Sequence, residues 1–473
     1  PRRRRPAARG GVPRADRTGG VPLSFAQLDI MHQPVDPEAS HHNVITATVL
    51  TGTLDPAALR DSLDAIVARH EALRTRIVED SAGSWRQLAD PSGGWPLAAV
   101  DLSGEPEETR TGALRRLVEA EVDRPFRLAE GPLVRGTLVT TGPDTWVLVL
   151  VLHHIVVDLW SYALLGRELG ELYAARVLGR EPRLPEPALQ YPDWAAWQRR
   201  RLADGELDEH VAHWERLLTD LPELPRFEAP EHQKAEAVEG YTSGFVLEPE
   251  VTAALKEAAQ REGTTLFMLL LSAFHLLLQS YAQEEAGTDL AVGFPLAGRE
   301  HPQTEQMIGF FINPVVVRPR PAGDATVRDL VTAVRAGVLD AHRHQEVPLR
   351  WLRRDAGEDR NPLRLLFNLL NVAGDPLDLH GLSAAPLNLN VGDAEVIPEL
   401  ITEMRPHNAD LYLMMHESDA GLRGLWLYAP DRIDPRSMAA MMRRWPAVLD
   451  LLTGEPDLPL AELRRRVRQH PAS

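Results

Sequence analysis

The sequence predicts a protein of two lobes, each an α/β sandwich in which strands and helices alternate. Its 473 residues exceed what one hydrophobic core usually supports. Segments with strand-like and helix-like patterns alternate in both halves of the chain, which is typical of α/β folds. Between the halves, residues 180–194 contain four prolines and cannot form one helix. We therefore place the connection between the lobes around this segment.

The first lobe contains three clearly patterned elements. Residues 55–70 predict a helix, because Asp55 can cap it, Pro56 suits its first turn and apolar residues recur at helical spacing. Residues 145–154 (TWVLVLVLHH) are a continuous apolar run, typical of a strand that is buried on both faces. Residues 161–179 return to helical spacing and end near a glycine.

The second lobe repeats the alternation, although no short repeat is visible in the sequence. The predicted elements are a strand over 241–249, helices over 250–263, 264–282 and 326–345, and a strand followed by a loop over 289–300. The longest apolar-rich run (265–278) lies in the second of these helices and is interrupted by Ser272 and His275. It predicts a core helix, because a membrane helix needs about 20 apolar residues.

The predicted organisation is a lobe over residues 22–190, a second lobe over 191–453, and a linker at each end. Residues 1–21 predict a flexible tail that begins with PRRRR, and residues 454–473 predict a C-terminal linker. The tail has no apolar segment of the kind found in signal peptides.

The composition excludes several classes of function. A formal net charge of −17 argues against nucleic-acid binding by the body of the protein. The absence of cysteine rules out disulfides and thiolate chemistry and fits a reducing compartment, so we expect a cytoplasmic protein. No phosphate-binding loop, dinucleotide fingerprint or G-x-S-x-G elbow is present, which disfavours nucleotide-dependent enzymes and serine hydrolases.

The stretch HHIVVDLWS (153–161) places two histidines at the end of the apolar strand and an aspartate shortly after them. Successive side chains of a strand point to opposite faces, so His153 and His154 do not suit one metal ion, and we predict no metal site. A histidine at a strand end can accept a proton near neutral pH. A hydrogen-bonded core histidine is the competing interpretation, and the residues alone leave both open.

The same stretch resembles the HHxxxDG signature of the condensation domains of nonribosomal peptide synthetases, in the chloramphenicol-acetyltransferase-like superfamily. Further stretches match motifs of that family in the right order, and the resemblance runs from about Pro22 to about Leu452. They are PLSFAQLDI (22–30), RHEALRTRI (69–77), YPDWAAWQR (191–199), VGFPLAGRE (292–300), IGFFINPVVVR (308–318), HQEVPLRWL (344–352), FNLLN (367–371) and HNADLYL (407–413).

The resemblance implies a fold, an activity and partners. It implies two acetyltransferase-like lobes in a V-shaped pseudodimer with a central tunnel. In the family, donor and acceptor peptidyl carrier proteins dock on opposite faces, and each threads a phosphopantetheine arm toward the central histidine. The acceptor amine there attacks the donor thioester and forms an amide. The resemblance therefore implies that this domain needs no cofactor of its own, because both substrates arrive tethered to carriers, and that neighbouring synthetase domains are its other partners.

The resemblance also implies roles for the central cluster. His154 falls on the second motif histidine and is the candidate base, or the group that orients the amine. His153 and Asp158 complete the catalytic motif, and both are expected to hold the loop. In the family this aspartate pairs with an arginine, for which Arg299 and Arg74 are the candidates.

Other residues are candidates for supporting or contacting roles. Ser161, or backbone N–H groups after the motif, are candidates to bind the developing oxyanion. Leu159 stands where the motif has glycine, so it either follows ordinary backbone angles or narrows the channel. Trp160, Asn313 and Asn368 are candidates for tunnel or substrate contacts, with packing or loop hydrogen bonds as the competing interpretation.

Three other activities compete with amide formation. An ester-forming or free-standing acyltransferase of the superfamily would use a hydroxyl nucleophile. An epimerization domain shares the histidine motif, but the chain has the opening LSFAQ and lacks an EGHGRE-like segment. A non-catalytic docking domain would recruit a tailoring enzyme; such domains typically lose the second histidine, which is present here as His154.

Overall fold

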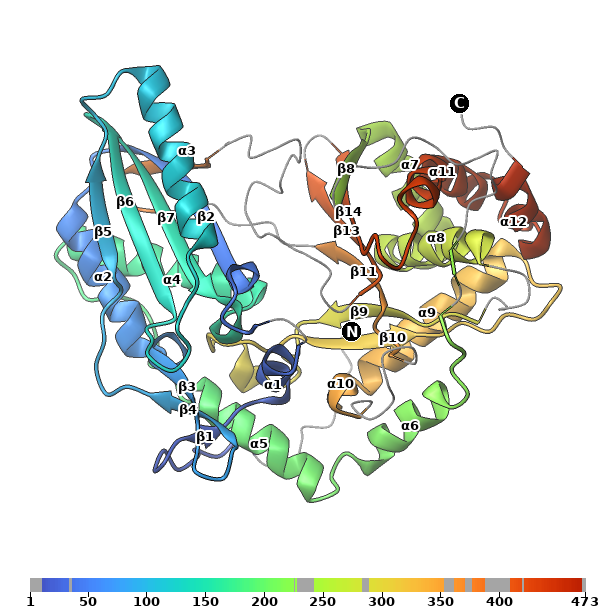
Figure 1. Ribbon diagram of the computed structural model, residues 1–473, viewed down its shortest axis with the longest axis horizontal. Coiled ribbons are helices and arrows are strands. Elements are labelled where there is room, and N and C mark those ends of the chain that lie inside the picture. The colour runs from blue at the N-terminus through green and yellow to red at the C-terminus, as the bar shows by residue number, and fades with distance from the viewer. Residues whose placement is uncertain are drawn as a thin grey trace. The chain divides into compact units, whose positions relative to one another are not determined.

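The chain folds into two compact units, each built from more than one chain segment (Figure 1). The structure is a computed structural model, and it describes residues 11–33, 36–224, 226–227, 242–282, 289–352, 361–370, 377–387, 409–418 and 421–469. Unit 1 comprises Pro1–Glu206, Ala297–Ile312 and Ala373–Glu403, and unit 2 comprises Leu207–Leu296, Asn313–Val372 and Met404–Ser473.

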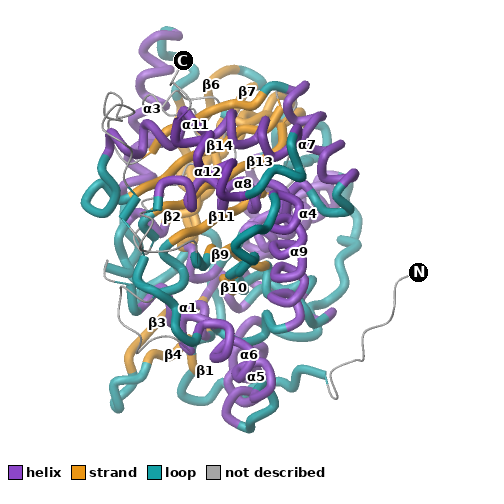
Figure 2. Tube along the Cα trace, turned by 90° about the vertical axis from the view of Figure 1, so that its right-hand side faces the viewer, coloured by secondary structure: helices purple, strands orange, loops and turns teal. Residues whose placement is uncertain are grey.

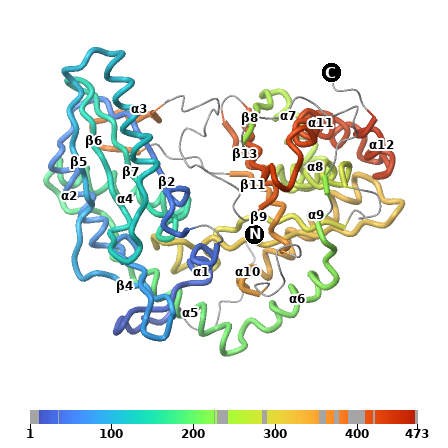
Figure 3. Tube along the Cα trace, viewed as in Figure 1, coloured from blue at the N-terminus to red at the C-terminus, as the bar shows by residue number. Residues whose placement is uncertain are grey.

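This division differs from the predicted boundary after residue 190. Helix 191–203 belongs to unit 1, and so does the segment Ala297–Ile312 from the second half of the chain. Figure 3 follows the chain by colour, and this segment appears in yellow among the blue and green elements of unit 1. A prediction that cuts the chain at one point could not assign this segment to unit 1, because the residues that hold the segment there are far away in the sequence.

The predicted linkers also differ from the structure. In the predicted tail, Arg17 forms ion pairs of 2.8 Å with both Glu71 and Asp193, so this part of the segment is anchored to unit 1. In the predicted C-terminal linker, a helix spans Leu460–Gln469 and buries three apolar side chains. Residues 1–10, with the PRRRR run, and residues 470–473 lie outside the described part of the chain.

The structure contains the helices and strands predicted from the sequence, together with others for which no prediction was made. Those of unit 1 are β1 (Val21–Pro22), α1 (Phe25–Met31), β2 (Asn43–Gly52), α2 (Pro56–Arg69), β3 (Thr75–Glu79), β4 (Trp85–Ala89), β5 (Leu97–Asp101), α3 (Glu107–Asp123), β6 (Val134–Gly142), β7 (Thr145–His153), α4 (Leu159–Val177), α5 (Tyr191–Ala203) and β12 (Leu382–Pro386). Those of unit 2 are α6 (Asp208–Leu218), β8 (Thr242–Leu247), α7 (Pro249–Arg261), α8 (Leu266–Tyr281), β9 (Val292–Leu296), β10 (Asn313–Val317), α9 (Val327–Arg343), α10 (Leu349–Leu352), β11 (Leu365–Leu370), β13 (Leu411–Ser418), β14 (Gly421–Tyr428), α11 (Pro435–Gly454) and α12 (Leu460–Gln469).

Unit 1 is a sandwich around a five-stranded sheet with the order β12-β2-β7-β6-β5. The central strand β7 is buried on both faces, as predicted, because its side chains alternate between two apolar clusters. Val147, Val149 and Val151 pack on the side of α3. Trp146, Leu148, Leu150 and Leu152 pack on the side of α2 and α4, and Figure 1 shows these helices on opposite faces of the sheet.

Unit 2 is built on a six-stranded sheet with the order β10-β9-β11-β13-β14-β8. The strand and helices predicted between residues 241 and 345 are confirmed, and α8 is the predicted core helix. Figure 2 shows α8 among the helices α9, α11 and α12, on one side of the sheet. No single described helix is long and apolar enough to span a membrane; α7 and α8 meet that criterion only as a pair, which bends by 100° at its break.

The two units share a four-stranded pattern. In unit 1, neighbouring strands of the order β2-β7-β6-β5 run antiparallel, antiparallel and then parallel to each other. In unit 2, β8-β14-β13-β11 pair in the same sequence of directions. The strand-to-helix turns after β7 and β14 also correspond: Asp158 caps α4 and bonds the N–H of Ser161, while Asp434 caps α11 and bonds the N–H of Ser437. The two lobes are therefore repeats of one architecture.

His275 of α8 gives unit 2 a predicted sensitivity to acid. Its side chain is fully buried, and neither ring nitrogen has a hydrogen-bond partner among the described residues. Burial lowers the pKa of His275 from 6.5 to about 3. Between these values the unfolded chain binds a proton that the folded chain does not, so this residue lowers stability as the pH falls.

We expect His275→Leu to remove this contribution, because leucine fills a similar volume without polar atoms. On lowering the pH from about 7.5 to about 5.5, the wild-type protein should lose about 1.4 kcal/mol more of its unfolding free energy than the variant. Urea unfolding at the two pH values measures this difference. Equal losses in the two proteins would contradict the assignment.

Candidate active site

The candidate site lies at the end of the unit 1 sheet where β7 ends and α4 begins. β7 ends at His153, residues His154–Val156 form a single 3-10 turn, and α4 begins at Leu159. The turn therefore brings both histidines and Asp158 together within a few residues. The backbone directs the three side chains to different partners.

His153 is fully buried and bonded to the backbone through both ring nitrogens. Its Nε2 lies 2.8 Å from the carbonyl oxygen of Pro37, and its Nδ1 accepts from the N–H of Ile155 at 3.1 Å. A carbonyl only accepts, so the proton is on Nε2 and the ring is neutral. Burial lowers the pKa of His153 to about 3, which keeps it neutral. This side chain holds the loop and has no nitrogen left for proton transfer.

His154 is half-buried and has one engaged nitrogen. Its Nδ1 lies 2.8 Å from the carbonyl oxygen of Val157, so Nδ1 carries the proton and donates it. The neutral ring then presents a lone pair at Nε2, which has no hydrogen-bond partner among the described residues. The ring of Phe310 packs edge-on against the imidazole, with centroids 4.8 Å apart. His154 is therefore an oriented proton acceptor.

Asp158 is buried, and its carboxylate binds Arg299 rather than Arg74. Arg299 donates from Nη2 to Asp158 Oδ1 at 3.0 Å, and both side chains are almost completely buried. The N–H groups of Ser161 and Phe311 donate to the same carboxylate at 2.7 and 3.0 Å. Arg74, the other predicted candidate, donates to the carbonyl of Asp90. The carboxylate thus fastens the segment Ala297–Ile312 to the start of α4.

Ser161 strengthens the same connection. Its hydroxyl donates to the carbonyl of Gly309 at 2.8 Å and accepts from the N–H of Gly309 at 3.0 Å and from Arg299 at 2.6 Å. The side chain is fully buried. These bonds occupy the hydroxyl, so the geometry favours a supporting role over the predicted alternative of an oxyanion donor.

Two motifs far away in the sequence support the histidine turn, and their roles were not predicted. Gln27, from the LSFAQ motif, donates to the carbonyl of Ile155 at 3.2 Å. Tyr191, from the YPDWAAW motif, contacts the hydroxyl of Ser24 at 2.7 Å and donates to the carbonyl of Phe310. Burial raises the pKa of Tyr191, so its hydroxyl stays protonated and donates. The sequence signal was the presence of these motifs, but it did not indicate what they contact.

The central cluster offers few ligands for a metal ion. Both nitrogens of His153 are engaged, and the carboxylate of Asp158 is occupied by Arg299 and two backbone N–H groups. Nε2 of His154 remains as a donor atom, and one nitrogen does not make a metal site. The cluster is suited to accepting a proton.

Residues 18–465 match the family described as "Condensation domain". The chain belongs to the condensation-domain family. The relatives that it matches are much longer than this chain. One of the subunits of linear gramicidin synthase from Brevibacillus parabrevis is 34% identical over 448 residues, which cover 92% of this chain and 6% of that protein. A probable non-canonical nonribosomal peptide synthetase of Salinispora arenicola is 34% identical over 464 residues, covering 94% of this chain and 6% of that protein.

The solved structure of the complex of the X-domain and OxyB from teicoplanin biosynthesis contains a similar chain. The TM-score is 0.76 at 26% sequence identity, and the match covers 96% of this condensation domain and 98% of that chain. The predicted fold of two sheet-based α/β lobes is therefore confirmed.

Leu159 occupies the position of the motif glycine in this condensation domain. It is the first residue of α4, and Asp220 is the one non-glycine residue with a positive φ in the described part of the chain. The turn thus follows ordinary backbone angles, which was one of the two predicted alternatives. Next to it, Trp160 is 48% exposed, and its indole donates to the carbonyl of Glu305 at 3.1 Å.

Replacing Leu159 with glycine is expected to have little effect on the acyl transfer that the family resemblance implies, because Leu159 has ordinary backbone angles. The variant should lose about 0.5–1 kcal/mol of unfolding free energy, since glycine weakens the first turn of α4. Turnover assays and urea unfolding of the two proteins test both expectations. A large gain in turnover for the glycine variant would show instead that Leu159 obstructs the substrate path.

Asn313 and Asn368 both belong to unit 2 and have local partners. Asn313 donates to the carbonyls of Gln345 and Val347 at 2.6 and 2.8 Å, and so holds the turn between α9 and α10. Asn368 of β11 lies 3.4 Å from the hydroxyl of Tyr412 on β13. The geometry favours the loop-holding interpretation for Asn313. A contact of either residue with substrate stays a prediction.

Proposed function

We propose that this condensation domain catalyses amide bond formation between two carrier-bound substrates, in the cytoplasm. The amine of an acceptor aminoacyl group attacks the carbonyl carbon of a donor acyl or peptidyl thioester. The carbon–nitrogen bond forms, the carbon–sulfur bond breaks, and the donor carrier leaves as its thiol. Peptidyl carrier proteins and neighbouring synthetase domains are the proposed partners, and no cofactor of the domain's own takes part.

The observation that carries this proposal is the orientation of His154. Its Nδ1–H is fixed on the carbonyl of Val157, which leaves the Nε2 lone pair as the proton acceptor. As the new bond forms, Nε2 takes the proton of the attacking amine, and the protonated ring returns it to the leaving thiolate. Proximity of the two tethered reactants supplies a further part of the rate.

The proposed roles of the other motif residues are positional. His153 ties the turn to Pro37 and Ile155, while Asp158, Arg299 and Ser161 fasten it to Ala297–Ile312. Asp434 supports this assignment, because it caps α11 in the corresponding turn of unit 2, where the strand ends in Tyr428 and no histidine pair precedes it. In unit 2, an aspartate thus caps the helix in a turn that has no candidate base, so capping alone is a sufficient role for Asp158 in unit 1.

A second candidate function is docking of a partner protein without catalysis. The similarity to an X-domain solved in complex with OxyB supports it, at 26% identity over 96% of this chain. The presence of His154 favours catalysis, since docking domains of the family typically lack the second histidine. An ester-forming activity differs only in the nucleophile, and the product distinguishes it.

Intact-protein mass spectrometry of both carriers tests the proposal. An acceptor carrier is loaded with an aminoacyl group and a donor carrier with an acyl group, and the domain is then added. We expect the acceptor to gain the mass of the acyl group while the donor returns to the free thiol form. A matched acceptor loaded with a hydroxyacyl group reports ester formation. A folded domain that transfers no acyl group to either acceptor, from a panel of acyl and peptidyl donors, would contradict catalysis and favour docking.

A further inference from the structure

Unit 2 contains a cluster of imidazole and carboxylate groups that the proposed function does not use. Among the residues that the structure describes, His213, Asp340 and His344 are the group whose ligand atoms all lie within 4.8 Å of one another. We propose that they form a binding site for a divalent transition metal of the zinc class, which fixes α6 to α9. The proposal departs from the absence of metal predicted from the sequence, because that prediction considered the histidine pair His153–His154 at the end of β7.

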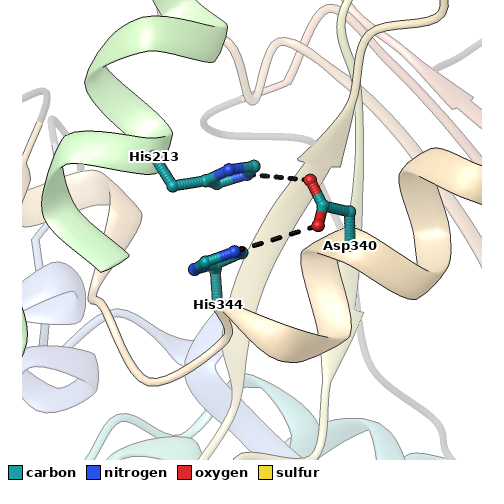
Figure 4. A group of neighbouring side chains, drawn as sticks. All are labelled: His213, Asp340 and His344. Carbon is teal, nitrogen blue, oxygen red and sulfur yellow. Dashed lines mark ion pairs between the residues drawn. The ribbon is translucent and has the colours of Figure 1, made fainter. Parts of the chain in front are cut away.

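The three side chains point toward one another from two helices (Figure 4). His213 lies on α6, Asp340 lies on α9, and His344 directly follows α9. Nε2 of His213 is 3.5 Å from Asp340 Oδ2, and Nε2 of His344 is 3.8 Å from Asp340 Oδ1. Ligand atoms of a tetrahedral zinc ion are roughly 3.3 Å apart, given bonds of about 2.0–2.1 Å. Both observed separations are somewhat longer, so the side chains must rotate inward to bind one ion.

The two imidazoles lie face to face, with centroids 3.9 Å apart and planes 6° apart. Both Nε2 atoms face the carboxylate of Asp340. Because the lone pairs of parallel rings lie in parallel planes, the two rings must tilt relative to each other to bind one ion. Two histidines and one carboxylate leave a position for water, and imidazole ligands suit zinc and its neighbours in the first transition series.

His210 can orient one of the proposed ligands, His344, through a hydrogen bond. Its Nδ1 lies 3.0 Å from Nδ1 of His344. A hydrogen bond between two ring nitrogens requires a proton on one of them. With the proton on His344 Nδ1, that ring donates to His210 and directs its Nε2 lone pair toward the ion. A metal-bound histidine typically donates its other N–H to a neighbouring acceptor in this way.

The carboxylate of Asp340 is accessible from solvent, since its side chain is 41% exposed. Asp340 also pairs with Arg343 at 3.3 Å, but that side chain is 67% exposed. An exposed ion pair of this kind is weak, so a divalent ion can displace it.

A bound ion would connect the first helix of unit 2 to its neighbour. α6 is already held by a hydrogen bond from the indole of Trp214 to the carbonyl of His344, at 2.9 Å. Arg318 also donates to the carbonyls of Leu217 and Thr219, at the end of α6. An ion at the His213–Asp340–His344 site would add a coordinate link between α6 and the end of α9. The role inferred is structural, and it is independent of the reaction at His154.

Zinc titration of the metal-depleted protein, prepared without a histidine tag, tests the proposal. Competition with a chromogenic chelator gives the affinity, and Co²⁺ absorption reports the coordination geometry. We expect one ion per chain. The Co²⁺ absorption should be that of an ion with a low coordination number, since the cluster offers three protein ligands. His213→Ala should weaken binding by about 100-fold or more, and His210→Ala by about 10–100-fold through loss of orientation of His344.

Two further variants keep the test decisive. Asp340→Asn retains the shape of the side chain, so it reports on the site if His213→Ala does not fold. His380→Ala is the matched control, because His380 is an exposed histidine of unit 1. Loss of binding in Asp340→Asn with full binding in His380→Ala supports the proposal. Equal zinc affinity of the wild type, His213→Ala and Asp340→Asn, or no stoichiometric binding by the wild type, overturns it.

Discussion

Replacing His154 with alanine is expected to slow acyl transfer by about 10²–10⁴-fold, the usual contribution of a positioned general base. The variant loses the Nε2 acceptor, while the thioester and the amine are still delivered by their carriers. Stability should change little, because His154 is half-buried and the hydrogen bond of its ring to Val157 closes a local turn. Single-turnover transfer from donor to acceptor carrier, followed by intact mass, measures the rate.

The matched control for this prediction is His380→Ala, which removes an exposed imidazole from the same unit. It should retain the wild-type rate. His154→Gln adds a further comparison, because the amide side chain keeps polarity but cannot accept a proton as a base. A wild-type rate in both His154 variants would show that delivery of the substrates accounts for the reaction, with no proton transfer to this residue.

Replacing Asp158 with alanine is expected to lower the unfolding free energy by about 3–5 kcal/mol, because it leaves the guanidinium of Arg299 buried without its counter-charge. The side chains of both residues are 2% exposed. The same change removes the acceptor for the N–H groups of Ser161 and Phe311. Urea unfolding measures the loss, and we expect transfer activity to fall with it.

Asp55→Ala is the control for the loss of a helix cap alone. Asp55 caps α2 in the same unit through the N–H groups of Ala57 and Ala58, and its removal should cost about 1 kcal/mol. Combining Asp158→Ala with Arg299→Leu should restore part of the stability, because no unpaired charge then remains. An Asp158→Ala protein of wild-type stability without activity would instead place the carboxylate in the chemistry.

Local structure was predictable because it depends on short stretches of sequence. The apolar run 145–154 has no polar face, and the structure buries both faces of β7. The helix over 55–70 was predicted from its cap and its periodicity, and it is observed as α2. Which chain segments make up unit 1 was not predictable. Ala297–Ile312 belongs to it and is held there by the ion pair of Arg299 with Asp158, two residues that are 141 positions apart in the sequence.

The candidate site was predictable in part for the same reason. The histidines and Asp158 are close in sequence, so the pattern placed them together. The resemblance narrowed the partner of Asp158 to two arginines, but only the structure chose Arg299. Gln27 and Tyr191 bond to carbonyl oxygens, which every residue possesses, so no side-chain pattern indicated their partners. The proposed His213–Asp340–His344 site was not predictable, because its residues come from α6 and from the end of α9, which are far apart in the sequence.

The repeated architecture separates what this fold needs from what the reaction needs. Both units turn from a strand into a helix through an aspartate cap and a serine three residues later. Only in the turn of unit 1 does a histidine pair precede the aspartate. The aspartate cap therefore belongs to the repeated turn, whereas the histidine pair belongs to the turn of unit 1 alone. Under the proposed function, the histidines of unit 1 can be exchanged for the residues of the unit 2 turn to obtain a folded domain without the proposed base.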